Sequence, residues 1–397
     1  MNGIRVGFIT IHRGINFGTA LQTFAMHTAL ERLGYSATLI DYQYPAKYHL
    51  SKAARDENRK RFSFLERFPL VFSVARTIKR LMTGEFWETR RQKDKFRAFL
   101  YRIPHTKEYD MAGIEKDPPQ FDIYLTGSDQ CWNPRYMHHD HSMLLNFAPD
   151  SAPKIAYASS FGCSELGPEF REEYRHYLLR YNALSVRERS GCSLIEDLTG
   201  RKDARYVLDP TFLLDGNDWL NAIKSNTIQV KGKYILCYIL DYVFNVYPAI
   251  NAMIEEVRKA YGLPLVFIGK NLYPARSNVR TLMDVGPEDF LDLVSKAAFV
   301  VTTSFHGTAF SINFRKDFLA ILNPNQSLDD RVANILKATG MSDRGVLLGG
   351  SVSEVLKHKT DYSAQAEKCI SDLRQESLSF LSNELRKCTG LRNDRTV

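Results

Sequence analysis

One histidine, His306, lies where an apolar run meets small residues, in the stretch VVTTSFHGTAFSI at residues 300–312. The residues before it have the β-branched composition of a buried strand, and those after Gly307 follow an apolar helical pattern. A helix that begins directly after a strand points free backbone N–H groups and its positive dipole end at the sheet edge, which favours an anion. A histidine there can donate a proton, or it can be a structural residue satisfied by a backbone carbonyl. We predict an anion-binding site with His306 as a catalytic residue, beside Ser304, Gly307 and Thr308.

A second polar stretch, TGSDQCWNPRY at residues 126–136, directly follows the strand-like run FDIYL. Asp129 could act as a general base or hold a sugar hydroxyl, and Trp132 could stack on a sugar face. The alternative is a helix cap followed by an anchoring tryptophan. We predict that Asp129 is catalytic and that the acceptor is bound by Gln130, Trp132 and Asn133.

Two arginines and one turn could bind the anion of a donor substrate. Arg187 and Arg189 leave a strand in the stretch SVRERSG, and we expect one of the two to face the site. A guanidinium suits a carboxylate or a phosphate. In HRGINFGTALQ, Asn16 can hold a turn and Gly18 lets a ligand approach the backbone, although neither a dinucleotide fingerprint nor a P-loop is present. We assign Asn16 and Gly18 to donor binding.

Strand-like and helical runs alternate along the chain, first from IRVGFITI to ARYVLDPTFLL and again from YILCYIL to DDRVANILKATG. This alternation predicts an α/β fold with two Rossmann-like domains that face a cleft, as in glycosyltransferase-B enzymes: residues 1–215 and residues 216–397. A terminal helical pattern could pack back across the first domain. Asp209 ends a strand at the domain junction, and we interpret it mainly as a structural hinge residue. Because unrelated functions share one fold, the sites must decide the function.

The composition excludes several classes of protein. Of the 397 residues, 44% are hydrophobic and 25% are charged, which is ordinary for a soluble protein with two cores. The six cysteines are scattered without a CxxC pair, so we expect neither disulfides nor a zinc site. The first apolar run is too short for a signal sequence, and no run reaches the roughly 18 apolar residues of a membrane span. We expect a cytoplasmic protein without a metal.

The net charge of +8 is concentrated in one segment, residues 52–102, which contains 15 Lys and Arg against 6 Asp and Glu. Aromatic and aliphatic residues are interleaved with these charges. A basic amphipathic helical insertion of this kind could lie on an anionic membrane surface. Alternatively, it could pack its apolar face on the domain and leave its charges in solvent. Nucleic acid is not expected as a partner, because no recognisable nucleic-acid module accompanies the charge.

Taken together, the motifs resemble those of the polysaccharide pyruvyl transferase family. The segments that carry the resemblance appear in this order: NFGTALQ, GSDQCWNP, SVRERSG, VLDPTFLL, GPEDFLDLVSKAAFVVTTSFHGTAFSI and DDRVANIL. The resemblance implies a glycosyltransferase-B-like fold and transfer of a pyruvyl group from phosphoenolpyruvate to sugar hydroxyls, usually as a cyclic ketal and without a cofactor. It also implies that Arg187 binds the donor and that His306 is the family histidine.

One position departs from the family pattern. Many members carry an arginine two residues before the motif histidine, where this chain has Ser304. If that arginine holds the donor phosphate in its relatives, backbone N–H groups and hydroxyls must take its place here, or another cation must do so. The candidate cations are Lys154, Arg189 and Arg331.

These expectations combine into one functional prediction. Protonated His306 holds the phosphate of phosphoenolpyruvate and protonates it as it leaves, while Asp129 orients or deprotonates the acceptor hydroxyl. The expected acceptor is a galactose-type residue of a lipid-linked oligosaccharide, used for capsule or exopolysaccharide, at the inner face of the cytoplasmic membrane. The basic segment at residues 52–102 would place the enzyme there as a peripheral protein.

Two other functions stay open at this point. A glycosyltransferase with a nucleotide-sugar donor needs a ribose-binding carboxylate in the second domain, for which Glu288 and Asp289 are candidates, although both suit the first turn of a helix. A non-catalytic protein that binds glycan or membrane is the other alternative. The convergence of arginine, histidine and aspartate at several strand ends argues against it, because a binding module has little need of that set.

Overall fold

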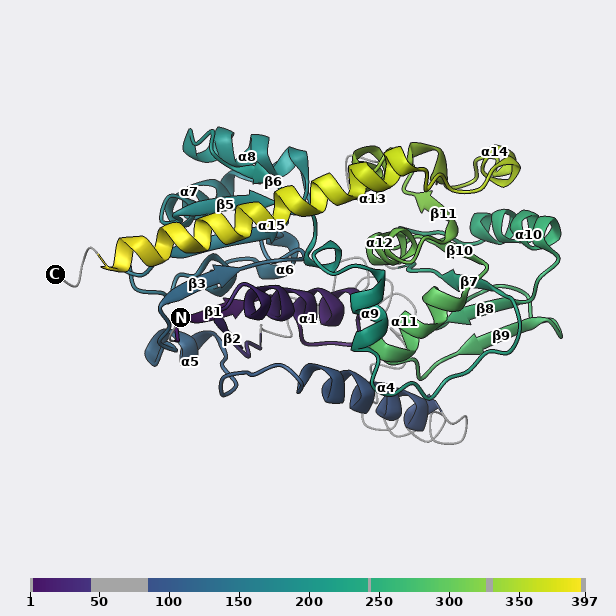
Figure 1. The fold of residues 1–397 in the computed structure, drawn as a ribbon, viewed down its shortest axis with the longest axis horizontal. Helices are drawn as coiled ribbons and strands as arrows, with labels where there is room; N and C mark the ends of the chain where they lie inside the picture. Colours follow the sequence, from purple (N-terminus) through teal and green to yellow (C-terminus); the bar gives the residue numbers. More distant parts are fainter. Residues whose placement is uncertain (1–2, 44–84, 242–243, 326–330, 394–397) are drawn as a thin grey trace, which may run out of the picture.

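The computed structural model describes residues 3–43, 85–241, 244–325 and 331–393, and within these ranges two parallel sheets of six strands form the frame of the molecule (Figure 1). The first sheet has the order β2-β1-β3-β4-β5-β6 and the second the order β12-β11-β10-β7-β8-β9. Every pairing between neighbouring strands is parallel. The predicted α/β fold with two Rossmann-like domains is confirmed.

The strands are short, and most are buried, as expected of strands covered on both faces. Those of the first sheet are β1 (Arg5–Ile9), β2 (Ser36–Leu39), β3 (Ile123–Thr126), β4 (Lys154–Ser159), β5 (Ala183–Val186) and β6 (Arg205–Tyr206). Those of the second are β7 (Ile235–Tyr238), β8 (Leu265–Ile268), β9 (Val279–Leu282), β10 (Phe299–Thr302), β11 (Asp317–Leu322) and β12 (Gly345–Leu347).

Helices connect these strands in both domains. In the first domain they are α1 (Phe17–Arg32), α4 (Glu85–Leu100), α5 (Met111–Lys116), α6 (Pro134–Met137), α7 (Pro168–Leu178) and α8 (Arg189–Thr199), with the 3₁₀ turns η3 (Ser142–Leu144) and η4 (Pro210–Phe212). In the second they are α9 (Gly216–Ala222), α10 (Ala249–Tyr261), α11 (Pro287–Lys296), α12 (Phe305–Asn313), α13 (Arg331–Ala338), η5 (Ser342–Arg344), α14 (Ser353–Lys357) and the terminal α15 (Ala364–Asn393). No helix in the described ranges is both long and apolar enough to span a membrane.

The strand order reverses once in each sheet, and the predicted site segments lie at these reversals. In the first sheet β1 has β2 on one side and β3 on the other, and in the second sheet β7 lies between β8 and β10. Ligands of open α/β sheets bind outside the carboxyl ends of the strands at such points. The loops after β1, β3 and β10 therefore carry Asn16, Asp129 and His306 to the positions where a ligand is expected.

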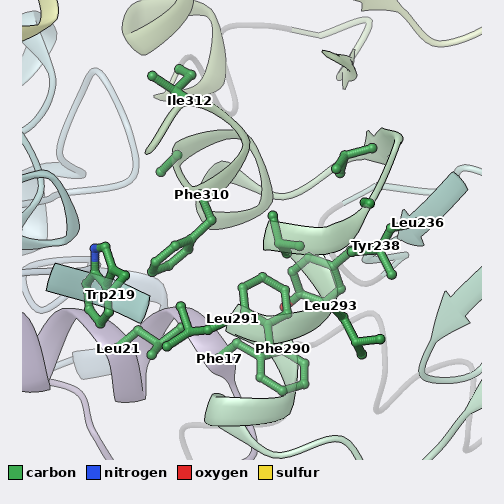
Figure 2. Close-up of a cluster of buried hydrophobic side chains, with 14 of the residues drawn as sticks. Phe17, Leu21, Trp219, Leu236, Tyr238, Phe290, Leu291, Leu293, Phe310 and Ile312 are labelled. Atoms are coloured by element: carbon green, nitrogen blue, oxygen red, sulfur yellow. The ribbon is translucent and has the colours of Figure 1, made fainter. Parts of the chain in front are cut away.

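An apolar core joins the two domains. Phe17 and Leu21, from the first turns of α1, belong to one buried cluster with Trp219, Phe290 and Phe310 of the second domain (Figure 2). The rings of Phe17 and Phe290 stack, with centroids 4.6 Å apart. Burial of such side chains contributes about 1.5–3 kcal/mol each. The start of α1 is thereby fixed against the second domain.

The terminal helix α15 runs along both domains (Figure 1). Near its start Ile370 lies in the core that joins the domains, and further along Leu381 and Leu385 are buried with Val6 and Tyr157 under the first sheet. Leu208 N–H, just before η4, donates to Ser377 Oγ at 2.9 Å. The helix therefore connects the second domain back to the first.

Part of the basic segment at residues 52–102 is visible, since α4 forms its last third, whereas residues 52–84 lie outside the described ranges. Phe96 and Phe99 of α4 are buried in the core that joins the domains. Three of its cations pair with acids of the second domain: Arg91 with Asp284, Lys95 with Asp289 and Arg102 with Glu288. In its described part, the segment packs on the protein, and these three cations form ion pairs with the second domain.

The contacts of Asp289 generate a first prediction. This carboxylate is 2% exposed and accepts from Lys95 Nζ and from the N–H groups of Thr227, Ile228 and Gly286. Asp289→Ala leaves the three backbone N–H groups without this acceptor and removes the ion pair of Lys95, whose Nζ keeps the Asp284 carbonyl, so the free energy of unfolding in urea should fall by about 3–5 kcal/mol. The control is Asp284→Ala, which removes the exposed pair with Arg91 and should cost about 0–1 kcal/mol. Equal losses in the two variants would contradict this account of the interface.

Candidate active site

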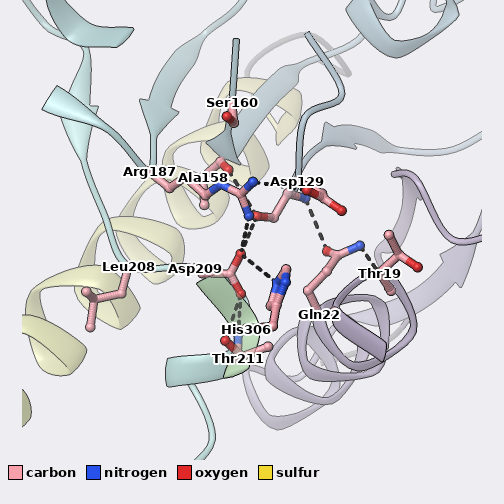
Figure 3. A network of polar contacts seen from close by, with 12 residues as sticks. Thr19, Gln22, Asp129, Ala158, Ser160, Arg187, Leu208, Asp209, Thr211 and His306 are labelled. Atoms are coloured by element: carbon pink, nitrogen blue, oxygen red, sulfur yellow. Dashed lines mark hydrogen bonds and ion pairs between the residues drawn. The ribbon is translucent and has the colours of Figure 1, made fainter. Parts of the chain in front are cut away.

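The guanidinium of Arg187, directly after β5, lies at the centre of the site (Figure 3). Its side chain is 1% exposed, and it donates Nη2–H to Asp129 Oδ1 at 3.0 Å. It also donates Nε–H to Glu188 Oε1 at 3.1 Å and Nη1–H to Asp209 Oδ2 at 3.0 Å. Arg189 is the first residue of α8 and is exposed.

The charged side chains of this cluster stabilise one another in their ionised forms. Burial alone would lower the pKa of Arg187, but the carboxylates of Asp129 and Glu188 raise it above its ordinary value. Burial alone would raise the pKa of Asp209, but His306, Arg187 and the Thr211 N–H hold that pKa well below its usual range. Asp209 therefore stays ionised although it is completely buried.

His306 joins this cluster from the second domain, in the first turn of α12. Its Nε2 lies 3.7 Å from Asp209 Oδ2 and has no hydrogen-bond partner among the described residues, although the side chain is only 9% exposed. The ring of Phe305, the preceding residue, lies over the Arg187 guanidinium at 4.9 Å. A buried imidazole nitrogen without a partner, beside a carboxylate held ionised, is suited to proton transfer with a ligand.

The structure corrects the role predicted for Gly18. A Cβ atom on Gly18 would lie 1.9 Å from Nδ1 of His306, so the space beside this glycine is filled by the histidine ring and not by a ligand. Asn16 caps α1, since its Oδ1 accepts from the N–H groups of Gly18 and Thr19 at 2.9 and 3.3 Å. Both residues place the start of α1 against His306, and Gly18 offers no open space to a donor.

The polar groups around His306 are used mainly within α12. Ser304 Oγ accepts from the Gly307 N–H at 3.3 Å, and Thr308 Oγ1–H donates to the Ser304 carbonyl at 3.1 Å. Gly307 is required for packing, because a Cβ there would lie 2.2 Å from Thr302 Oγ1. The N–H groups of Phe305 and His306 have no partner in the part of the chain that the structure describes. These two N–H groups, more than the three predicted residues, are the free donors at the start of the helix, where backbone N–H groups favour an anion.

The loop after β3 departs from the prediction in one respect. The ring of Trp132 is completely buried, packs against Phe161 and donates Nε1–H to the Met143 carbonyl at 3.1 Å. It therefore cannot stack on a sugar, and the alternative of an anchoring tryptophan after a helix cap describes this loop. Asn133 is that cap, at the start of α6, and donates Nδ2–H to Gln130 Oε1 at 2.6 Å.

Asp129 keeps one oxygen available for an acceptor. Its Oδ1 accepts from Arg187 and from the Gln130 N–H, whereas Oδ2 has no partner among the described residues. The backbone of Asp129 has a φ of 66°, in the left-handed region that few residues other than glycine adopt. The contacts of Oδ1 fix the carboxylate, and Oδ2 is free to hold or deprotonate a hydroxyl.

Of the three cations considered as a replacement for the family arginine, the structure favours one. Lys154 is completely buried and donates to the carbonyls of Pro149 and Ala152, and burial lowers its pKa to about 8. Arg189 stacks on Tyr206 at 5.0 Å. Arg331, the first residue of α13, is close enough to Arg187 to lower its pKa through charge repulsion. Arg331 is therefore the cation that accompanies the buried cluster.

Glu288 and Asp289, the two acids considered for binding a ribose, make contacts at the interface between the domains. Glu288 accepts from Arg102 and from the N–H groups of Lys224 and Ser225, and Asp289 accepts from Lys95 and three backbone N–H groups. Both oxygens of Asp289 and Oε1 of Glu288 are therefore used at the domain interface.

Several members of the site were not recognised in the sequence. Asp209, interpreted as a hinge residue, also joins Arg187 to His306 and accepts from Ser128 Oγ at 2.9 Å. Glu188 was not considered, although it is buried and accepts from Ser160 Oγ at 2.8 Å. In the structure β6 lies beside β5, which brings the end of VLDP next to Arg187. The sequence indicated which strand ends carry polar residues, but it did not show which of these ends lie next to each other.

Comparison with known proteins gives one family. Residues 16–325 match the family model described as polysaccharide pyruvyl transferase, which is most of the chain. No curated protein matches the sequence.

Among solved structures, the fold is similar to that of UDP-GlcNAc 2-epimerase from Neisseria meningitidis bound to UDP-GlcNAc, with 10% identity, 96% of this chain and 99% of that chain covered, and a TM-score of 0.51. It is also similar to the S. aureus MnaA-UDP co-structure, with 12% identity, 96% and 91% covered, and a TM-score of 0.50. At this identity the likeness extends to the fold alone.

The electrostatics of Asp209 give a second prediction. Asp209→Asn removes the charge shared by Arg187 and His306, so the free energy of unfolding at neutral pH should fall by about 1.5–3 kcal/mol. Because folding lowers the pKa of Asp209, its contribution is fully present above the ordinary value of 3.8 and is lost as the pH falls below it. The difference between wild type and variant in urea unfolding should thus be constant down to about pH 5 and narrow below about pH 4. A difference that does not change with pH would show that Asp209 is not held ionised by folding.

Proposed function

This chain belongs to the polysaccharide pyruvyl transferase family, and on that premise we propose that it transfers the pyruvyl group of phosphoenolpyruvate to two hydroxyls of one sugar residue, forming a cyclic ketal and releasing phosphate. The proposed acceptor is a galactose-type residue of a lipid-linked repeat for capsule or exopolysaccharide, at the inner face of the cytoplasmic membrane. The observation that carries the proposal is the unpartnered Nε2 of His306, buried at the start of α12 and 3.7 Å from Asp209.

The donor's phosphate suits the start of α12. The free N–H groups of Phe305 and His306 and the helix dipole favour a phosphate, and Arg331 adds a positive charge nearby. Arg187 was expected to bind the donor directly, but three of its N–H groups are held by carboxylates and its side chain is 1% exposed. We assign Arg187 to positioning: it fixes Asp129 and Asp209 at the distances that the reaction uses.

The bonds and protons of the proposed reaction balance, and residues of the site can carry two of the proton transfers. Protonation of the methylene carbon of phosphoenolpyruvate makes a methyl group and a cationic central carbon, to which one sugar hydroxyl bonds. The bond from that carbon to the phosphate oxygen then breaks, and a second hydroxyl of the same sugar closes the ketal. Of the two hydroxyl protons, one replaces the proton given to the methyl group and the other leaves on phosphate. Asp129 Oδ2 takes a proton from the acceptor and His306 gives one to the leaving phosphate.

A nucleotide-sugar glycosyltransferase is the weaker proposal. Its fold would suit this chain, but the two carboxylates considered for a ribose, Glu288 and Asp289, already pair with Arg102 and Lys95 and with backbone N–H groups. The sequence offered only these two acids of the second domain for binding a ribose.

The first test is phosphate release from phosphoenolpyruvate with lipid-linked or model β-galactosides, comparing wild type with His306→Ala. Loss of the general acid should lower the rate by about 10²–10⁴-fold without unfolding the protein. Gly18→Ala should also lower it at least about tenfold, because the new methyl group displaces the imidazole.

The matched control is Gly390→Ala, in α15, where a Cβ meets nothing within 4 Å. This variant should retain wild-type turnover. Turnover in His306→Ala at the wild-type rate would overturn the proposal, and a thermal shift with a nucleotide sugar but no phosphate release would favour the glycosyltransferase.

The role of Arg331 gives a further prediction. Arg331→Ala should raise the KM for phosphoenolpyruvate about tenfold or more, as expected when a charged contact worth about 1.5–3 kcal/mol is lost. Arg189→Ala serves as the control, because that arginine is exposed and stacks on Tyr206. An increase in KM with Arg189→Ala but not with Arg331→Ala would assign the phosphate to the other arginine.

A further inference from the structure

Two histidines and a glutamate converge on the surface of the first domain, apart from the site above. His139 and His141 lie in the loop between α6 and η3, and Glu173 lies in α7. His139 Nδ1 is 2.9 Å and His141 Nε2 is 3.0 Å from the same oxygen, Oε2 of Glu173. The three potential ligand atoms all lie within 4.8 Å of one another. We call these three residues the His₂Glu cluster.

The geometry points to a binding site for a divalent transition-metal ion, with Zn²⁺ as its natural probe, in the His₂Glu cluster. Two imidazole nitrogens and one carboxylate oxygen are a ligand set that zinc uses. Ligands about 2.0–2.2 Å from a tetrahedral zinc ion lie roughly 3.3 Å apart, so the observed nitrogen-to-oxygen distances need to widen by only a few tenths of an ångström. This site was not expected from the sequence, where only the cysteines were weighed as zinc ligands.

The rings of the cluster are held in place by α7. The ring of His141 packs on Tyr177 with centroids 4.9 Å apart, and that of His139 packs on Phe170 at 5.3 Å. Phe170 and Tyr177 flank Glu173 by about one helical turn on either side, so a single helix face supplies one ligand and orients the other two. This pre-orientation reduces the entropy that an ion must overcome on binding.

The cluster is open to solvent on one side. The side chains of His139, Glu173 and His141 are 59%, 37% and 14% exposed. Three protein ligands leave at least one coordination position for water, and the exposed side gives the ion a path of entry.

A bound ion would join two segments that carry parts of the active site. The loop with His139 and His141 continues from Asp129, and α7 follows the turn that contains Ser160. One contact already connects them, since Tyr174 Oη–H donates to the Trp132 carbonyl at 2.9 Å. A metal in the His₂Glu cluster would add a second link, and because it binds the folded chain, it would stabilise it. This inference does not depend on the proposed function.

The test uses the full chain, freed of metal by a chelator and of any affinity tag, titrated with Zn²⁺ in a calorimeter and by thermal unfolding. We expect one Zn²⁺ per chain and a higher Tm. His139→Ala and Glu173→Gln should each weaken the affinity at least about tenfold, because each removes one of three ligands. His176→Ala is the matched control, since this histidine is exposed on the same helix but outside the cluster, and it should bind like the wild type.

Three results would overturn the assignment. The first is a metal-free chain that binds no stoichiometric Zn²⁺. The second is equal Zn²⁺ affinity in wild type, His139→Ala and Glu173→Gln, which would place the ion on other residues such as the cysteines. The third is binding without any change in Tm, which would remove the stabilising role. Because both variants replace partly exposed side chains, far-ultraviolet circular dichroism suffices to show that they fold.

Discussion

The site depends on one buried guanidinium. Arg187 is removed from water almost completely, and the three carboxylates around it offset the cost of burying its charge. An arginine of this kind would cost several kcal/mol if a partner were removed, so each of the three acids is held in place as firmly as the arginine itself. Asp209 extends the constraint to His306, and Phe305 covers the guanidinium from the second domain. The positions of the reactive groups therefore follow from how a single charge is compensated.

This constraint works only if the two domains keep a fixed relation, and three separate contacts provide it. The stacked rings of Phe17 and Phe290 bring the start of α1 against the second domain. Lys95 of α4 and Arg102 just after this helix form ion pairs with the acids of α11. The terminal helix α15 runs along both domains. The consequence is seen at Gly18, where no side chain can be added because the imidazole from the other domain already lies against the backbone. The site is built across the interface and is not a property of either domain alone.

The sequence predicted those features of the structure that depend only on residues close together in the chain. The strand, the turn and the helix around His306 are encoded within about fifteen residues, so these elements and the position of His306 at the start of a helix could be predicted. Trp132 and Asp209 could not be assigned in this way, because a tryptophan in a polar loop can face solvent or the core, and only the packing of Phe161 and Tyr181 decides it. The order of the strands, which sets Asp209 beside Arg187, is likewise a tertiary property.

The charge of the cluster limits how an anionic donor can bind. One guanidinium among three carboxylates leaves a net negative charge, which by itself repels a phosphate or a carboxylate. The attraction must then come from groups outside that set, and the described residues offer the free N–H groups at the start of α12, His306 and Arg331. A serine at position 304 is compatible with this arrangement, since its hydroxyl accepts from the Gly307 N–H and leaves the N–H groups of Phe305 and His306 open. The negative cluster has a different use: it places the ionised carboxylate of Asp209 3.7 Å from Nε2 of His306, the group that we propose gives a proton to the leaving phosphate.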